Sequence, residues 1–99
     1  MTSIMRGTDI PFFIRNLPEG AEIKRLDFAQ CGIILITKTT EDFDFDGTTA
    51  SAWLTQEDTL KLKEKYMIDI QLSLHINGKA KRTLIKRISS DKILYEGVI

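Results

Sequence analysis

Hydrophobic and polar residues alternate most regularly between Tyr66 and Ile76. Six apolar side chains occupy every second position of this segment: Tyr66, Ile68, Ile70, Leu72, Leu74 and Ile76. A strand places such side chains on one face, whereas a helix would scatter them around its axis. A pairing slip of one residue would bury Asp69 and His75 instead, so the buried face is strongly specified. The pattern predicts a half-buried strand over residues 66–76.

A hairpin is expected directly after this strand, because the Asn-Gly dipeptide at positions 77 and 78 tolerates the positive φ angles of a tight turn. A strict two-residue turn would place Ile68 opposite the charged Arg87. A three-residue turn ending in a bulge places Ile68 opposite Ile88, and it also sets Leu72 opposite Leu84. We expect the bulged turn, because it pairs apolar side chains across the strands.

Shorter extended runs are predicted on both sides of this hairpin. They cover residues 10–15, 23–29, 33–39, 80–88 and 93–98, with Ser89-Ser90-Asp91 breaking the last two apart. Pro11 has no amide hydrogen for a ladder, which favours an edge strand or a strand start. A type I turn with Pro18 second and Gly20 fourth separates the first two runs. Gly32 is the expected positive-φ residue of the next turn.

One segment favours a helix. Thr55 is a suitable cap, and Asp58 three residues later completes a capping-box pattern. A helix over residues 56–62 is too short to be stable by itself, since isolated helices below about 12 residues are marginal. It is expected to serve as a crossover between two sheets.

The acidic stretch EDFDFDG, residues 41–47, allows two interpretations. Asp42, Asp44, Asp46 and Gly47 match the start of an EF-hand calcium loop, but the twelfth position is Trp53 instead of Glu and no amphipathic helix precedes the stretch. The favoured alternative is a hairpin with a two-residue turn at positions 46 and 47. It places Phe45 opposite Thr48, Phe43 opposite Ala50, and the carboxylates toward water. The same register turns Trp53 outward, where it is a candidate interface anchor.

Composition supports one folded domain covering residues 1–99. Apolar residues make up 42% and charged residues 28% of the chain, and the 14 basic residues balance the 14 acidic ones. A chain without net charge has no field to draw it onto nucleic acid or an anionic membrane, so protein partners are expected. The single cysteine, the lack of a signal-peptide pattern and the lack of a long apolar segment favour a reducing cytoplasm and no membrane insertion.

Taken together, these elements predict an all-β fold. About seven short strands with turn signals between them, plus one short helical crossover, indicate an antiparallel β-sandwich of immunoglobulin-like build.

Candidate chemistry is sparse. His75 is the only histidine and falls on the polar face of its strand, and Cys31 falls in an expected turn. A solvent-facing histidine and a free thiol without function are the favoured interpretations. The basic string KAKRTLIKR alternates with apolar residues, which favours a solvated strand face over a nucleic-acid patch. No phosphate loop, CxxC pair or nucleophile elbow occurs in the sequence, so we expect a protein that is not an enzyme and needs no cofactor or metal.

Four segments resemble a known group of proteins: RGTDIPFFI, LDFAQCGIILITK, LTQEDTLKLKEKYMIDIQLSL and ILYEGVI. They are similar to small uncharacterised proteins of tailed phages and prophages of Gram-positive bacteria, and more distantly to the N-terminal β-sandwich module of upper baseplate proteins. The resemblance begins at Met5 and covers most of the chain. Its motifs are structural: the strand ending in Gln30, the crossover from Leu54 to Leu60, the strand with Gln71, and the terminal Gly97-Val98-Ile99.

This resemblance implies a virion or virion-assembly protein without active residues. We expect a non-enzymatic tail or baseplate component that acts through protein contacts, forms homo-oligomers and meets other phage structural proteins in the host cytoplasm or in the virion. Trp53 and the strand with Pro11 are the expected interface. The alternative is a small binding module, either a carbohydrate-recognising receptor-binding domain or an inhibitor of a host protein.

Overall fold

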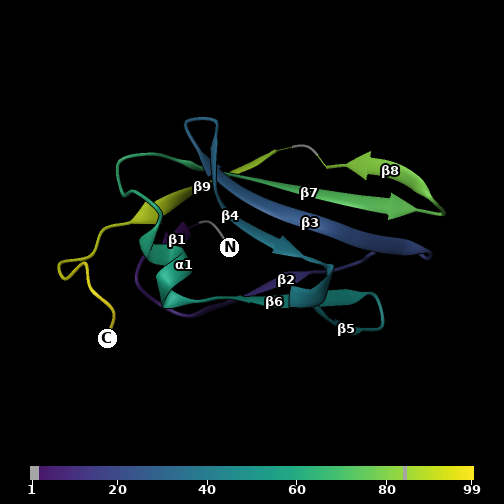
Figure 1. Ribbon diagram of the computed structural model, residues 1–99, viewed down its shortest axis with the longest axis horizontal. Helices are drawn as coiled ribbons and strands as arrows, with labels where there is room; N and C mark the ends of the chain where they lie inside the picture. Colours follow the sequence, from purple (N-terminus) through teal and green to yellow (C-terminus); the bar gives the residue numbers. More distant parts are fainter. Residues whose placement is uncertain (1–2, 84) are drawn as a thin grey trace.

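The computed structural model describes residues 3–83 and 85–99, and over these residues strands dominate (Figure 1). Its strands are β1 (Ser3–Met5), β2 (Ile10–Ile14), β3 (Ala21–Gln30), β4 (Ile33–Thr39), β5 (Asp44–Asp46), β6 (Thr49–Leu54), β7 (Ile68–Ile76), β8 (Lys79–Arg82) and β9 (Lys86–Asp91). The helical elements are the 3₁₀ turn η1 (Thr40–Asp42) and the helix α1 (Gln56–Leu60). The predicted all-β class is confirmed, although the described residues form more strands than the seven or so expected.

The strands form two sheets that face each other (Figure 1). The large sheet has the order β1-β9-β7-β3-β4, with β8 also paired to β7, and the small sheet has the order β2-β6-β5. All pairings are antiparallel except that of β1 with β9, which is parallel. The expectation of purely antiparallel pairing is therefore wrong for β1, a strand that the sequence pattern did not predict.

The core lies between the sheets. Phe12 of β2 meets Phe28 of β3 edge to face, with ring centroids 5.5 Å apart and ring planes at 84°. This geometry is the one that aromatic pairs prefer. Among the described residues, fifteen buried apolar side chains form the core cluster, most of them from the two sheets and two from outside the strands, Phe43 and Leu62. Burial of this cluster, rather than any one pairing, holds the two layers together.

Strand β7 confirms the alternation read from the sequence. Ile68, Ile70, Leu72 and Leu74 are buried, while the polar residues between them are only half-buried. The strand begins at Ile68, two residues later than predicted, and Tyr66 is exposed outside it. The reason lies in Gln30, whose side-chain amide donates to the Tyr66 carbonyl at 3.0 Å and so binds a group that a ladder would need.

The hairpin after β7 combines both expected registers. Next to the turn, Leu74 lies opposite Lys81 as in a strict two-residue turn, but farther along Ile68 lies opposite Ile88. The two registers differ by one residue, so the bulge falls between β8 and β9. The prediction that it lies at the turn is wrong. Thr83 explains the shift, because its hydroxyl accepts the Leu72 amide at 3.1 Å and so replaces a backbone acceptor. The predicted pairing of Leu72 with Leu84 lies outside the described residues.

The C-terminal predictions are wrong. Residues 89–91 continue β9 and pair with β1, and no strand forms over residues 93–98. Side chains hold this segment instead: the Arg6 guanidinium binds the Glu96 carboxylate through two contacts of 3.0 and 2.9 Å, and the Gln56 amide donates to the Ile99 carbonyl at 3.1 Å. Because β1 already pairs with the outer side of β9, residues 93–98 have no unpaired backbone groups of β9 to bind.

Three further predictions hold with small shifts, and the type I turn does not. Strand β4 has the predicted bounds, α1 begins after its Thr55 cap but ends two residues early, and β2 lies at a sheet edge as Pro11 indicated. The first turn is displaced by one residue, because the Ala21 amide donates to the Pro18 carbonyl at 3.1 Å. Gly20 thus occupies the third position, with φ of +79°, and the turn is not of type I.

The acidic stretch forms the predicted hairpin in a different register. Asp46 pairs with Thr49, so the turn residues are Gly47 and Thr48, and Phe45 lies opposite Ala50. The expected turn at positions 46 and 47 is wrong by one residue. Gly47 has φ of +60°, which suits the first central position of a hairpin turn and is unfavourable for Asp46.

Candidate interaction surface

The outer face of the small sheet carries both interface residues that the sequence analysis selected. In β2 the half-buried residues Ile10, Phe12 and Ile14 alternate with the exposed Pro11 and Phe13. In β6 the buried residues Ala50, Ala52 and Leu54 alternate with outer-face residues that include Trp53. Alternation in both strands therefore gives this sheet one core face and one outer face.

Three exposed apolar side chains lie together on this outer face, and we call them the aromatic strip: Pro11, Phe13 and Trp53. Pro11 lies directly opposite Trp53 in the pairing of β2 with β6, and Phe13 lies diagonally from Trp53. Diagonal neighbours in antiparallel strands are within reach of aromatic rings. Trp53 retains 60% and Phe13 50% of its accessible surface. Trp53 is thus exposed as expected, and the structure brings it beside Pro11.

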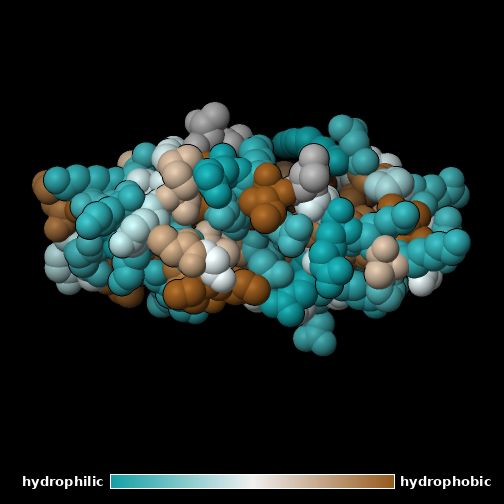
Figure 2. Space-filling view, turned by 90° about the horizontal axis from the view of Figure 1, so that it is seen from above, coloured by the Kyte–Doolittle hydropathy of each residue, from teal (hydrophilic) through white to brown (hydrophobic). Residues whose placement is uncertain are grey.

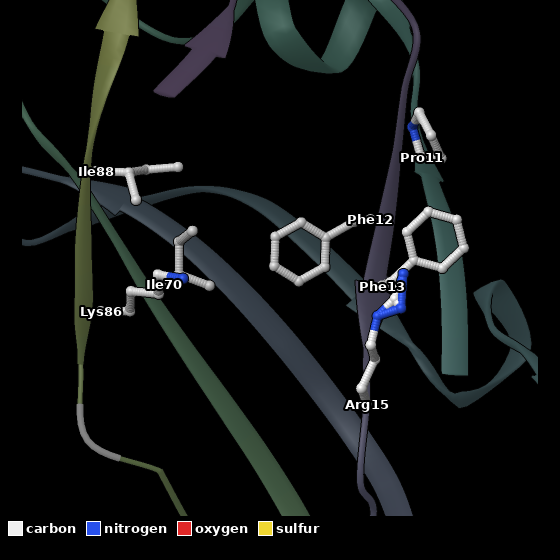
Figure 3. A pocket seen from close by; sticks show the side chains of 7 residues that line it. All are labelled: Pro11, Phe12, Phe13, Arg15, Ile70, Lys86 and Ile88. Atoms are coloured by element: carbon white, nitrogen blue, oxygen red, sulfur yellow. The ribbon is translucent and has the colours of Figure 1, made fainter. Parts of the chain in front are cut away.

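Sequence reasoning missed Phe13 as part of this strip. The signal was present, because Phe13 is two positions from Pro11 and residues two apart share a strand face. The Arg15 guanidinium lies 5.1 Å from the centre of the Phe13 ring (Figure 3). This cation–π contact holds a positive charge at the end of the aromatic strip.

A cavity of about 230 Å³ opens at the free edge of β2, where side chains from both faces of this strand line it together with residues of β7 and β9. Phe12 points toward Ile70 of β7 and Ile88 of β9, while the Phe13 ring lines the cavity from the other side of β2 (Figure 3). Lys86 and Arg15 also line the cavity. The cavity therefore has an apolar interior and two cations at its border.

The outer face of the large sheet has a different character. It carries ion pairs: Arg25 with Asp27 within β3 at 2.8 Å, and Arg87 of β9 with Asp69 of β7 at 2.7 Å. The hydrogen bonds that Arg25 donates to Asp27 raise the pKa of Arg25, and those that Arg87 donates to Asp69 do the same for Arg87. The side seen in Figure 2 is mostly hydrophilic, with apolar residues in separate patches.

The titratable residues considered for chemistry stay apart. His75 is half-buried on the polar face of β7, and Cys31 is exposed in the turn between β3 and β4 with φ of +51°. Among residues 3–83 and 85–99, no group of three His, Cys, Asp or Glu side chains is placed to hold a metal ion. The acidic residues of the former calcium-loop candidate lie along an exposed hairpin edge instead.

No protein-family model matches the chain, and comparisons with curated proteins and with solved structures find no match. Within the described residues, neither α1 nor η1 has the length and apolar character needed to cross a membrane.

Proposed function

We propose that this protein is a non-enzymatic assembly component that acts through protein–protein contacts at the aromatic strip. The observation that carries the proposal is the grouping of Pro11, Phe13 and Trp53 on the outer face of the small sheet. Exposed tryptophan and other aromatic anchors dominate the energy of many protein interfaces. The adjoining Arg15 adds the residue type that, with aromatics, is enriched in interfaces.

The proposal includes an immunoglobulin-like sandwich. The small sheet β2-β6-β5 corresponds in order to strands B, E and D of that architecture, and β3, β7 and β9 correspond to C, F and G. The short helix between β6 and β7 occupies the connection between E and F. Such sandwiches present whole sheet faces and edges to partners, which suits a component of a larger assembly.

The biological setting of the proposal is a phage or prophage tail or baseplate, with other phage structural proteins as partners and the host cytoplasm or the virion as location. Support for this setting is the resemblance of the segments that begin at Arg6, Leu26, Leu54 and Ile93. Ring assemblies of this kind multiply one small contact by symmetry.

A second candidate is a small binding module that recognises carbohydrate. Trp53 and Phe13 share one exposed face, and flat aromatic surfaces of this kind can contact sugar rings. Asp44 and Ser51, paired on the same face of β5 and β6, would supply polar groups for hydroxyls. Glycan binding by a chain that stays monomeric at high concentration would favour this candidate.

Size-exclusion chromatography with light scattering tests the leading proposal. The wild-type protein is expected to form a defined oligomer, and Trp53→Ser is expected to weaken association at least about tenfold. Ile33→Ser is the matched control, because Ile33 is a similarly exposed apolar residue at the β3–β4 turn, away from the strip. A wild-type mass of 11.3 kDa at every concentration would contradict the proposal.

A further inference from the structure

Both edges of the small sheet are open along the described residues. Its order is β2-β6-β5, so β2 and β5 each have one paired and one unpaired side. Unpaired edges are templates for the addition of another strand, and proteins commonly protect them with charges or proline. Here the two edges carry charges of opposite sign, which is the basis of the inference.

The β5 edge is acidic. Asp44 and Asp46 lie in the strand, Glu41 and Asp42 precede it, and all four are exposed. None of them belongs to an ion pair among residues 3–83 and 85–99. Their charges are therefore not neutralised by a described cation, although the Asp42 carboxylate already accepts the Thr39 amide at 2.8 Å.

The β2 edge is basic. Arg15 follows β2, Lys86 borders the neighbouring cavity, and both side chains are exposed. Neither makes an ion pair with a described residue, and the lining of the cavity contains no carboxylate. This edge is thus electrostatically complementary to β5.

Each edge also disfavours its own duplicate. Two β5 edges would bring two sets of four carboxylates together, and two β2 edges would bring Arg15 and Lys86 of one copy toward those of another. Only the mixed combination joins opposite charges.

We propose that copies of this chain associate head to tail, with the acidic edge strand β5 of one copy extending the small sheet at the basic edge strand β2 of the next. Along the sheet, β2 and β5 are both antiparallel to β6, so they run in the same direction. If the neighbouring copy has the same orientation, its β5 would therefore pair with β2 as a parallel strand.

The cavity beside β2 supplies a place for an aromatic side chain. Phe45 lies opposite the buried Ala50, on the core side of its sheet, yet it is 52% exposed because β5 is an edge. When β5 of a neighbouring copy extends the sheet beyond β2, its Phe45 faces the same side as Phe12. There the ring can enter the 230 Å³ cavity lined by Ile70 and Ile88 (Figure 3).

Asp44 and Asp46 of the neighbouring copy would then lie on the outer side of the extended sheet. Arg15 is on that side as well, because it follows Pro11 and Phe13 at a spacing of two. A contact between two different surfaces repeats at every copy, so it generates a ring if the rotation closes and a filament otherwise. The inference goes beyond the proposed function, since it requires the sheet edges and not the aromatic strip.

Charge-reversal variants test this pairing by light scattering. A basic-edge variant, Arg15→Glu with Lys86→Glu, and an acidic-edge variant, Asp44→Lys with Asp46→Lys, are each expected to associate at least about tenfold more weakly than the wild type. An equimolar mixture of the two variants is expected to regain association, because one variant then has two acidic edges and the other two basic edges, so every contact between them joins opposite charges. Lys79→Glu with Lys81→Glu on β8 is the control that repeats the charge change of the basic-edge variant away from both edges.

The outcomes separate this inference from the proposed function. Failure of the mixture to associate, or unchanged association of either edge variant, would overturn the edge pairing. If association then depends on Trp53 alone, the proposal of the aromatic strip as contact surface is supported and the edge pairing is wrong. If it depends on the edges and not on Trp53, the inference stands and the proposed contact surface fails. A wild-type protein that stays monomeric at all concentrations would overturn both.

Discussion

Gln30 is a buried polar residue whose role is structural. It lies at the end of β3 with only 3% of its surface exposed, and its side-chain amide makes three hydrogen bonds. It donates to the carbonyls of Lys63 and Tyr66 at 2.7 and 3.0 Å and accepts the Lys63 amide at 2.7 Å. One side chain thus pairs three backbone groups of the loop between α1 and β7.

Gln30→Ala is expected to lower the free energy of unfolding by about 2–4 kcal/mol, because buried backbone groups would lose their partners. Urea unfolding followed by circular dichroism measures the change. Gln71→Ala is the control. Gln71 donates one hydrogen bond, to the Thr83 carbonyl, at a more exposed position, so its replacement should lower the free energy of unfolding by less. Equal costs for the two variants would contradict this role of Gln30.

Asp58 links α1 to the large sheet. Its carboxylate accepts the Thr55 amide at 3.0 Å, as the predicted capping box requires, and contacts the Lys38 ammonium at 2.8 Å. Burial opposes ionisation of Asp58, but the hydrogen bonds and charge supplied by Lys38 and Thr55 outweigh it and lower the pKa. The sequence predicted the cap but not Lys38, because a contact between β4 and α1 depends on the tertiary fold.

The lowered pKa of Asp58 makes stability depend on pH. Since the folded pKa lies below that of the unfolded chain, ionised Asp58 stabilises the fold above about pH 4, and this contribution is lost as the pH falls further. Asp58→Asn should therefore reduce the free energy of unfolding at pH 7 and flatten its decline in acid. Asp44→Asn, at an exposed carboxylate, should leave the acid profile close to that of the wild type. Parallel profiles for wild type and Asp58→Asn would contradict the assignment.

At the scale of elements, the sequence predicts strands with clear alternation better than it predicts which strands pair and in which register. The alternation in β7 and the Asn-Gly turn after it depend on neighbouring residues, so the sequence indicates them directly. The bulge near Thr83 and the register of the acidic hairpin depend on side-chain hydrogen bonds and on which glycine takes the positive φ. No strand forms over residues 93–98, and strand propensity alone does not reveal that β1 already pairs with the neighbouring strand β9.

Two glycines with nearly equal backbone angles differ in their surroundings. Gly20 and Gly32 have φ of +79° and +77°, which disfavours any residue with a Cβ. A Cβ at Gly20 would collide with the side-chain oxygen of Asn77, whereas a Cβ at Gly32 would meet nothing within 4 Å. The Gly20 turn therefore packs against the Asn77 turn, and the Gly32 turn is open.

Gly32→Ala is expected to cost about 1–2 kcal/mol from backbone strain alone. Gly20→Ala should cost about 1 kcal/mol more, because the Asn77 side chain must shift to make room for the new Cβ. Thermal unfolding of the two variants in parallel measures the difference. A Gly32 variant that is as unstable as the Gly20 variant would show that the contact with Asn77 is unimportant.

For the whole molecule, the sequence predicted a sandwich but could not place its edges. Pro11 indicated an edge strand and the register of β6 indicated an outward Trp53, yet only the fold shows that they are direct neighbours. The parallel pairing of β1 with β9 joins residues from opposite ends of the chain, which no local pattern encodes. The open edges β2 and β5, with opposite charges, likewise follow from the sheet order alone.

The outer face of the small sheet is the proposed contact surface, and its single tryptophan reports on it directly. Trp53 is 60% exposed in the monomer, so acrylamide should quench its fluorescence efficiently in dilute solution. We predict that quenching becomes clearly less efficient as the protein concentration rises and the aromatic strip is covered. Quenching that stays constant across a range where light scattering records association would contradict the assignment of this face.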